Sequence, residues 1–252
     1  MFQLYKNWRR RRILARHPLD TTLWQGVLVE LRLLQGLTPQ ERQRLRDWVT
    51  LFLQRKQINA AGGLELTDGM RLTIAAQACL LILNLDPDMF DGWEEIIVYP
   101  EEFVPEFDEL DEIGVMHHRR DIRSGEAWLG GPVVLAWADI ARAVPGYNVV
   151  LHEFAHKLDM LNGDANGYPP LHANMNRQAW SAIFSSAFTD FQRRVAHREA
   201  TAIDPYAAEA PGEFFAVLSE TFFELPQVLQ QEYPEAYAQL ALYYRQDPAL
   251  RL

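Results

Sequence analysis

Apolar residues recur at helical spacing through the first third of the chain, in three segments separated by turn residues. Residues 20–34 and 39–56 each carry one apolar stripe with the three- and four-residue spacing of an amphipathic helix. The second segment opens with Thr-Pro-Gln-Glu at 38–41, a capping box with proline at the first helical position. Residues 68–83 are almost entirely apolar, so the third segment is predicted to be a buried central helix.

The pattern changes after residue 86, where short runs rich in β-branched and aromatic residues replace the helical spacing. We expect strands over 94–99, 114–119 and 130–137. Pro132 and the two glycines before it favour an edge position for the last of these strands. An edge strand can hold a peptide by strand addition, and an ordinary structural strand is an equally good interpretation.

Helical spacing returns in the rest of the chain. Further helices are predicted over 138–143, 148–162, 177–197, 212–223 and 234–245. The pattern predicts an α+β fold that is mainly helical, with a small mixed sheet. We expect one domain, in which residues 1–85 form a helical N-terminal portion and residues 86–252 form the catalytic portion.

The helix over 148–162 carries the strongest chemical signal in the chain. Residues 148–159 read Asn-Val-Val-Leu-His-Glu-Phe-Ala-His-Lys-Leu-Asp, which contains His-Glu-x-x-His. His152 and His156 lie one turn apart on one helix face, close enough to share a metal ion. Glu153 is placed to take a proton from a metal-bound water. This is the core of a zinc hydrolase site, and it makes the helix a zincin-type metal-binding helix beside the sheet.

The surroundings of the motif strengthen this interpretation. The five-residue pattern alone occurs by accident in roughly 1 in 100 chains of this length. Here Asn148 is a good N-cap, and Asn162-Gly163 is a good stop signal. Apolar residues cover much of the circumference, so the helix is predicted to be buried. Two histidines and a glutamate in a buried helix are costly unless they have a function, which disfavours a purely structural explanation.

Composition and charge narrow the function classes. The chain has 24 Lys and Arg against 34 Asp and Glu, and a net charge of −10 disfavours a general nucleic-acid binder. The single Cys79 is predicted to be a buried thiol, and this fits a reducing compartment. No apolar run approaches a membrane span, so we expect a cytoplasmic protein without a membrane partner.

Two charged segments have more than one interpretation. The basic run at 9–12 is expected to belong to a solvated N-terminal tail, although it could contact nucleic acid or lipid. Acidic residues recur from 86 to 112, with no Lys or Arg between Leu72 and His118. A solvated acidic surface is the preferred interpretation, and a docking face for a basic partner is the alternative.

A catalytic zinc ion normally has three protein ligands, so the two histidines need a third. The acidic and histidine candidates downstream are His172, Glu209, Glu213 and Glu220. Pro211 and Gly212 set a helix start, and Glu213 in the first turn could point toward the metal helix or simply favour the helix dipole. Glu220, two turns later on the same face, competes as a ligand or as a partner of a ligand. Asp159 could orient a ligand histidine or cap a nearby backbone.

These motifs resemble a known family. His-Glu-Phe-Ala-His-Lys-Leu-Asp, followed by Tyr206 and by Glu-Phe-Phe-Ala from Glu213, resembles the Mlc titration factor A family of bacterial zinc metallopeptidases. A more distant similarity is to the catalytic domain of anthrax lethal factor. The resemblance covers most of the chain and implies that His152, His156 and Glu213 hold Zn²⁺. It also implies that Glu153 is the general base and Tyr206 an assisting hydroxyl.

The resemblance gives two hypotheses about function. The first is a zinc metallopeptidase, with aminopeptidase-like action on short peptides and a regulatory tie to the glucose phosphotransferase system through binding of the repressor Mlc. The second is a non-catalytic protein that sequesters a transcriptional regulator, with a zinc site of secondary importance. A structural metal protein is a weaker third, because Glu153 would then have no purpose. Peptide or protein substrates and an Mlc-like repressor are the expected partners.

Overall fold

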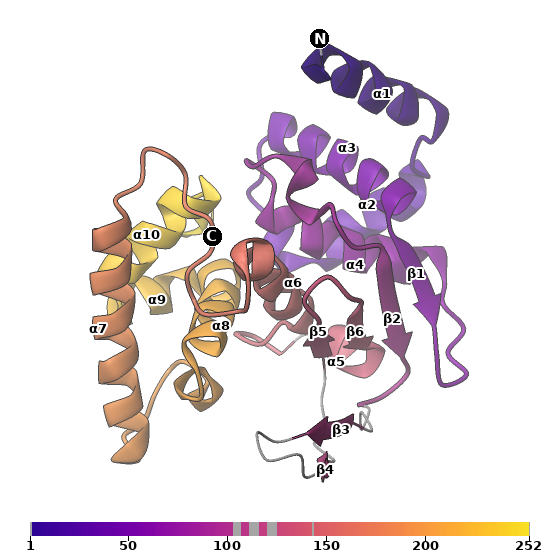
Figure 1. Ribbon diagram of the computed structural model, residues 1–252. Coiled ribbons are helices and arrows are strands. Elements are labelled where there is room, and N and C mark those ends of the chain that lie inside the picture. Colours follow the sequence, from indigo (N-terminus) through magenta and orange to yellow (C-terminus); the bar gives the residue numbers. More distant parts are fainter. Residues whose placement is uncertain (1, 103–106, 111–115, 120–124, 143, 252) are drawn as a thin grey trace.

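The structure is a computed structural model that describes residues 2–102, 107–110, 116–119, 125–142 and 144–251. These residues form ten α-helices, a four-stranded mixed sheet and a two-stranded hairpin (Figure 1). The predicted α+β class, mainly helical with a small mixed sheet, is therefore confirmed. Within the described part, no helix combines the length and the apolar character that crossing a bilayer requires.

The three N-terminal helices form where the apolar spacing places them. Helix α2 (Thr21–Glu30) is capped by Asp20 and followed by the 3₁₀ turn η1 (Arg32–Leu34). Helix α3 (Pro39–Arg55) begins with the predicted capping box, in which the Thr38 and Glu41 side chains bind each other's backbone N–H. Helix α4 (Asp68–Leu81) is buried from Ile74 to its end and holds the fully buried thiol of Cys79, as predicted.

The first residues form a helix and not a tail, although Arg9, Arg11 and Arg12 of the basic run are exposed to solvent as predicted. Helix α1 (Phe2–Arg16) has no glycine or proline to interrupt it and lies beside α3 (Figure 1). Lys6 and Arg10 on its inner face form ion pairs with Asp88, and Arg10 also reaches Asp86. Asp88 lies in the 3₁₀ turn η2 (Pro87–Phe90) and also binds Arg55, so this acid is not part of a solvated surface.

The four-stranded sheet has the order β1-β2-β6-β5. Strands β1 (Gln57–Ala60), β2 (Glu95–Tyr99) and β6 (Val133–Ala136) run parallel, and β5 (Gly125–Ala127) pairs antiparallel with β6. The prediction that residues 130–137 form an edge strand is wrong. Pro132 precedes β6, so it removes no ladder hydrogen bond, and β6 lies between β2 and β5 with all four residues buried. The edge on this side is β5.

The second strand prediction, 114–119, falls partly outside the described residues. Its final four residues form β4 (Met116–Arg119), which pairs antiparallel with β3 (Phe107–Leu110) in a separate hairpin. The acidic segment 86–112 also extends beyond the described residues. The short helix α5 (Trp137–Arg142) follows β6, as the sequence predicts.

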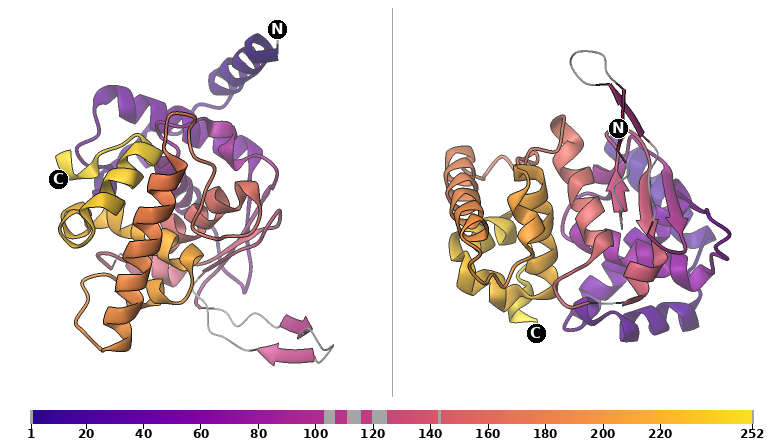
Figure 2. Two further views of the ribbon diagram at one scale, coloured as in Figure 1. Left: turned by 60° about the vertical axis from the view of Figure 1, so that its left-hand side comes forward. Right: turned by 90° about the horizontal axis from the view of Figure 1, so that it is seen from below.

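The remaining helices surround the motif helix. Helix α6 (Val149–Asp159) ends in the 3₁₀ turn η3 (Met160–Asn162), and α7 (Arg177–Ala196) follows after a loop. The 3₁₀ turn η4 (Pro205–Ala208) leads into α8 (Pro211–Glu224), α9 (Pro226–Glu232), α10 (Pro234–Tyr244) and the last turn η5 (Pro248–Leu250). Helix α6 packs against α4 on one side and α8 on the other, between the two groups of helices (Figure 2).

Candidate metal centre

Helix α6 presents the two motif histidines from a rigid, buried position. The Asn148 side chain caps the helix by accepting a hydrogen bond from the Leu151 N–H, as predicted. Every residue of α6 is buried, including His152, Glu153 and His156. The two imidazole rings lie one helical turn apart, with their centroids separated by 4.7 Å. Packing on both sides therefore fixes the direction of both rings.

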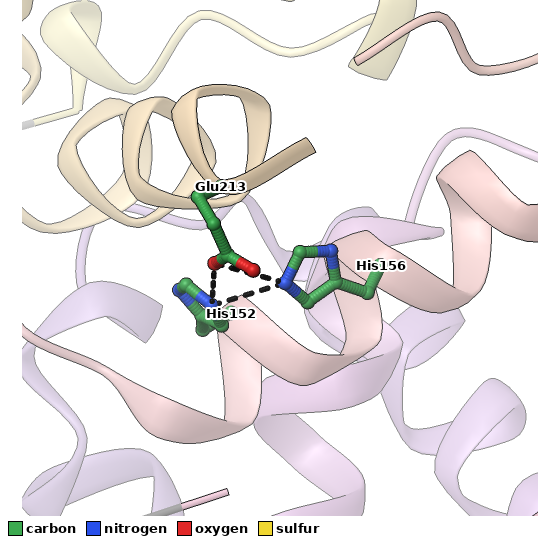
Figure 3. A group of neighbouring side chains, drawn as sticks. All are labelled: His152, His156 and Glu213. Atoms are coloured by element: carbon green, nitrogen blue, oxygen red, sulfur yellow. Dashed lines mark hydrogen bonds and ion pairs between the residues drawn. The ribbon is translucent and has the colours of Figure 1, made fainter. Parts of the chain in front are cut away.

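Helix α8 brings the third predicted ligand to the histidines. The helix starts at Pro211. Gly212 lies so close to the loop that follows η3 that a Cβ would be 2.9 Å from the Ala165 carbonyl oxygen. This close approach places Glu213, in the first turn, over the two rings (Figure 3). Its Oε2 lies 3.0 Å from His152 Nε2 and 3.3 Å from His156 Nε2. The two Nε2 atoms are 3.1 Å apart.

These separations fit a zinc ion. Tetrahedral coordination at metal–ligand distances of about 2.0–2.1 Å holds the ligand atoms about 3.3 Å apart. The three observed separations between donor atoms, 3.0, 3.1 and 3.3 Å, match that spacing closely. Two imidazole nitrogens and a carboxylate oxygen are also a donor set of catalytic zinc sites, which keep a fourth position open. Among the described residues, these three are the group of side chains able to hold a metal ion.

Glu220 supports the histidines from behind and does not join the donor set. Its Oε1 lies 2.7 Å from His152 Nδ1, and its Oε2 accepts a hydrogen bond from the Asn148 N–H. With Nδ1–H donating to Glu220, His152 Nε2 is the nitrogen that faces the other two donor atoms and can bind a metal ion. Of the two roles that the sequence left open for Glu220, the geometry therefore favours the partner of a ligand.

Contacts between His152 and the carboxylates of Glu213 and Glu220 shift the pKa values of the site. Burial opposes a charge on His152, but its contacts with Glu213 and Glu220 outweigh burial and raise its pKa well above the ordinary value. Burial would raise the pKa of Glu213, but contacts with His152 and His156 lower it well below the usual range. A proton and a metal ion therefore compete for His152 Nε2, so that metal affinity depends on pH.

Asp159 stabilises the loop after the helix. Its Oδ2 accepts a hydrogen bond of 2.7 Å from the Gly167 N–H, so the structure bears out the capping role rather than the orienting one. Its Oδ1 and His156 Nδ1 are both buried, and neither makes a hydrogen bond among the described residues. His172 lies outside the metal-binding group, and its Nε2–H donates to the Tyr243 carbonyl. Glu209 is exposed and lies outside the metal-binding group.

Glu153 lies beside the donor set and does not contribute to it. It is buried, and burial raises its pKa to about 7 although the neighbouring histidines oppose this shift. Strand β5 passes directly over it: a Cβ on Gly125 would lie 2.5 Å from Glu153 Oε1. This contact cannot be predicted from the sequence, because a three-residue strand carries no detectable alternation. The glycine at 125 was the one available signal.

Tyr206 stands at the mouth of the site. Tyr206 lies in η4 and is 45% exposed, and its ring centroid is 6.0 Å from that of His152. A cleft of about 460 Å³ opens here, and its lining includes β5, Tyr206, Glu153 and the three donor residues. The structure thus gathers all five predicted site residues around one cleft.

The sequence as a whole matches one protein family. Residues 5–245 match the model of the glucose-regulated metallo-peptidase M90 family. The chain belongs to this family. Membership confirms the predicted resemblance and identifies the protein as a member of a metallopeptidase family, which implies a metal ion.

Named relatives extend the same conclusion. The chain is 36% identical to Mlc titration factor A of Cronobacter sakazakii, over 97% of this chain and 92% of the relative. It is 37% identical to Mlc titration factor A of Escherichia coli, over 91% and 88% of the two chains. It is also 39% identical to an uncharacterized protein of Synechocystis sp., over 97% and 90%. The likeness therefore spans nearly the whole family chain and not the motif alone.

Proposed function

We propose that this protein is a zinc-dependent peptidase that uses His152, His156 and Glu213 as metal ligands. The observation that carries the proposal is the placement of Glu153. It lies next to three donor atoms at zinc spacing, inside an open cleft, and it is not itself a donor. A structural zinc site has four protein ligands and needs no such carboxylate. A zinc hydrolase needs an open coordination position and a general base beside it.

The residues divide the reaction between them. Zinc, when bound, supplies Lewis-acid chemistry that polarises the scissile carbonyl and makes a water nucleophilic. Glu153 accepts the proton of the attacking water and returns it to the leaving amine. The Tyr206 hydroxyl donates a hydrogen bond to the oxyanion as it forms, and its exposed position allows it to reach a bound peptide. Glu220 holds His152 in the tautomer that leaves Nε2 free to bind the metal.

Strand β5 is the element best placed to bind the substrate backbone. Among the described strands it forms the edge of the sheet beside α6, and its three residues line the cleft. An edge strand offers N–H and C=O groups that an extended peptide can pair with. A peptide added along β5 would pass over Glu153. The peptide-binding role that was one of two interpretations of residues 130–137 thus falls to residues 125–127.

The substrate preference and the partner rest on the family. We infer aminopeptidase-like action on short peptides in the cytoplasm, a reducing compartment that suits the one buried Cys79. The name of the two Mlc titration factor A relatives favours a second role, in which the chain binds an Mlc-like repressor and so regulates the glucose phosphotransferase system. In the alternative function, the chain only sequesters the repressor and its zinc site is secondary.

Metal analysis combined with hydrolysis of a peptide library tests the enzymatic role. We expect about one zinc per chain in both the wild type and Glu153→Gln. Turnover should fall by on the order of 10²-fold or more in the variant, because the general base is lost. Equal hydrolysis by the two proteins would refute the assignment. A library of free and N-terminally blocked peptides would show whether a free amino terminus is required.

Binding to a purified Mlc-type repressor tests the second role. If catalysis and binding are independent, Glu153→Gln retains the repressor as well as the wild type does. If the variant loses both, the repressor contact includes the cleft itself. Retention of the repressor without measurable hydrolysis by the wild type would favour the sequestering function over the peptidase.

A further inference from the structure

Lys157, the residue after His156, is buried and is not one of the three donor residues. Its side chain is 4% exposed, and its ammonium donates hydrogen bonds to two backbone carbonyls, those of Trp128 at 2.6 Å and Gly131 at 2.8 Å. An ammonium that loses its water requires such partners, because an unpaired buried charge is costly. No step of the proposed reaction uses this side chain, so its burial needs another explanation.

The two carbonyls belong to the turn that joins β5 to β6. Within this turn, the Trp128 N–H donates to the Pro132 carbonyl and the Gly131 N–H to the Trp128 carbonyl. Gly130 has φ +65°, a left-handed conformation that suits glycine. Lys157 therefore connects the metal helix directly to the end of the edge strand. Two hydrogen bonds from a charged donor make this a strong connection.

The position of β5 matters because the strand fits tightly on α6. A Cβ on Gly125 would lie 2.5 Å from Glu153 Oε1 and 2.6 Å from Val149 Cγ2, so the backbone rests on the side chain of the general base. A displacement of about 1 Å would change the distance between a peptide paired to β5 and Glu153. The distance between β5 and α6 therefore affects how close a bound peptide lies to the general base.

A second buried lysine provides an internal comparison. Lys56, at the end of α3, also donates to two backbone carbonyls, those of Phe90 and Trp93. Both ammonium groups lie over the Trp93 ring, with Lys56 Nζ at 3.6 Å and Lys157 Nζ at 4.6 Å from its centroid. The two lysines share burial, bonding and an aromatic neighbour. They differ in the segment that they hold, since Lys56 binds residues 90–93 and Lys157 binds the β5–β6 turn.

We propose that Lys157 is a positioning residue that holds edge strand β5 over Glu153, so that an extended peptide paired to β5 meets the general base. The proposal rests on the proposed peptidase function, and it gives Lys157 a role that Lys56 does not have. Lys157 fixes where the substrate backbone lies, whereas Lys56 contributes only to stability.

Lys157→Met and Lys56→Met test this assignment as a matched pair. Methionine keeps much of the aliphatic stem and removes the charged donor in each case. KM and kcat are measured for a peptide of six or more residues, which can pair with β5, and for a single-residue aminoacyl anilide, which cannot. We expect Lys157→Met to keep its zinc and to raise KM for the long peptide by on the order of 10-fold, the loss expected for hydrogen bonds to a charged group. The anilide constants should change little.

Lys56→Met should lower the melting temperature about as much as Lys157→Met does. It should leave the ratio of the two KM values at the wild-type level. Lys157→Arg, which retains a cationic donor, should recover most of the long-peptide KM. Equal KM ratios in wild type, Lys157→Met and Lys56→Met would overturn the proposal and leave Lys157 a purely structural residue. A uniform loss of kcat on both substrates would overturn it as well.

Amide hydrogen exchange provides a readout that does not depend on turnover. In Lys157→Met, exchange should speed up at residues 125–131, while Lys56→Met should affect residues 90–93 instead. If the wild type hydrolyses nothing, the peptidase assignment fails, and the exchange result still decides whether Lys157 holds β5. If the wild type is active and exchange at 125–131 is unchanged in Lys157→Met, the inference about Lys157 fails while the peptidase assignment stands. Should the methionine variant not fold, Lys157→Arg and Lys157→Gln are compared by the same exchange measurement.

Discussion

Two carboxylates in this chain are each surrounded by nitrogen atoms, and only one of these clusters has the donor atoms that a metal ion could use. Asp88 binds Lys6, Arg10 and Arg55 at 2.8 Å each, beneath α1. Glu213 lies 3.0 and 3.3 Å from the two motif histidines. The cleft at Asp88 is even the larger one, about 910 Å³ against about 460 Å³. Cleft size and the number of nitrogen contacts are both greater at Asp88, so neither quantity identifies a metal site.

The chemistry of the nitrogen atoms does separate them. The ammonium and guanidinium groups around Asp88 are positively charged and have no lone pair to donate to a metal. They bind the carboxylate as ion-pair partners. Each imidazole at Glu213 can direct a lone pair, and the two Nε2 atoms lie 3.1 Å apart around one point. A cluster of charged donors is an ion-pair network, and a cluster of convergent lone pairs is a ligand set.

Removal of zinc should give the largest difference between the two clusters. Zinc at about 1,000 times its Kd stabilises a folded protein by about 4 kcal/mol. We therefore expect a chelator to lower the melting temperature by several degrees and to abolish hydrolysis, and added zinc to restore both. Thermal unfolding with and without chelator checks this. An unchanged melting temperature in a protein shown to lose its metal would contradict the link between the site and stability.

Glu213→Ala should weaken zinc binding by more than the roughly 10–100-fold typical of losing an outer partner, because it removes a donor atom itself. Glu209→Ala is the matched control, since this nearby acid is exposed and outside the donor set. Zinc titration against a competing chelator measures both affinities. Equal affinities in the two variants would remove Glu213 from the ligand set and reopen the search for the third ligand.

Glu220→Gln should reduce zinc affinity by about 10–100-fold, because His152 loses the carboxylate that holds its Nδ1–H. Glu224→Gln is the comparison: Glu224 accepts a hydrogen bond from the Asn148 side chain, and within the described part of the chain it makes none to a histidine. We expect it to leave zinc affinity nearly unchanged. The same competition titration applies, and a larger effect for Glu224→Gln would mean that the support runs through Asn148.

Asp88→Asn should produce the smallest effect, a loss of about 1 kcal/mol in the free energy of unfolding, because these ion pairs are partly exposed to solvent. Zinc binding and turnover should be unaffected. Partial burial opposes the charge on Asp88, but the three cations outweigh it and hold its pKa well below the ordinary value. A depressed pKa stabilises the fold above the unfolded value near 4 and stops doing so as the pH falls.

The wild type should thus lose stability below about pH 4 relative to neutral pH, and Asp88→Asn should lose less. Denaturant unfolding at pH 7 and at pH 3.5 measures the difference. Identical acid sensitivity in the two proteins would show that other carboxylates dominate the response.

Local signals in the sequence predicted the parts of the fold that depend on neighbouring residues. The capping box at Thr38, the N-cap at Asn148 and the proline start at Pro211 each specify a helix end through contacts only a few residues apart. Strand order depends on pairing between distant segments, so the edge position was assigned to residues 130–137 when it belongs to β5. The role of Glu220 was open for the same reason, because only the packing of α8 on α6 sets its distance from His152.

The separation of the donor residues along the chain has a consequence for biosynthesis. His152 and His156 leave the ribosome together, whereas Glu213 and Glu220 follow 57 or more residues after His156. A nascent chain that ends before α8 carries the motif helix without a complete donor set. The proposed peptidase could therefore mature only after most of its fold has been synthesised, and a fragment truncated before residue 213 could not act on other proteins through this site.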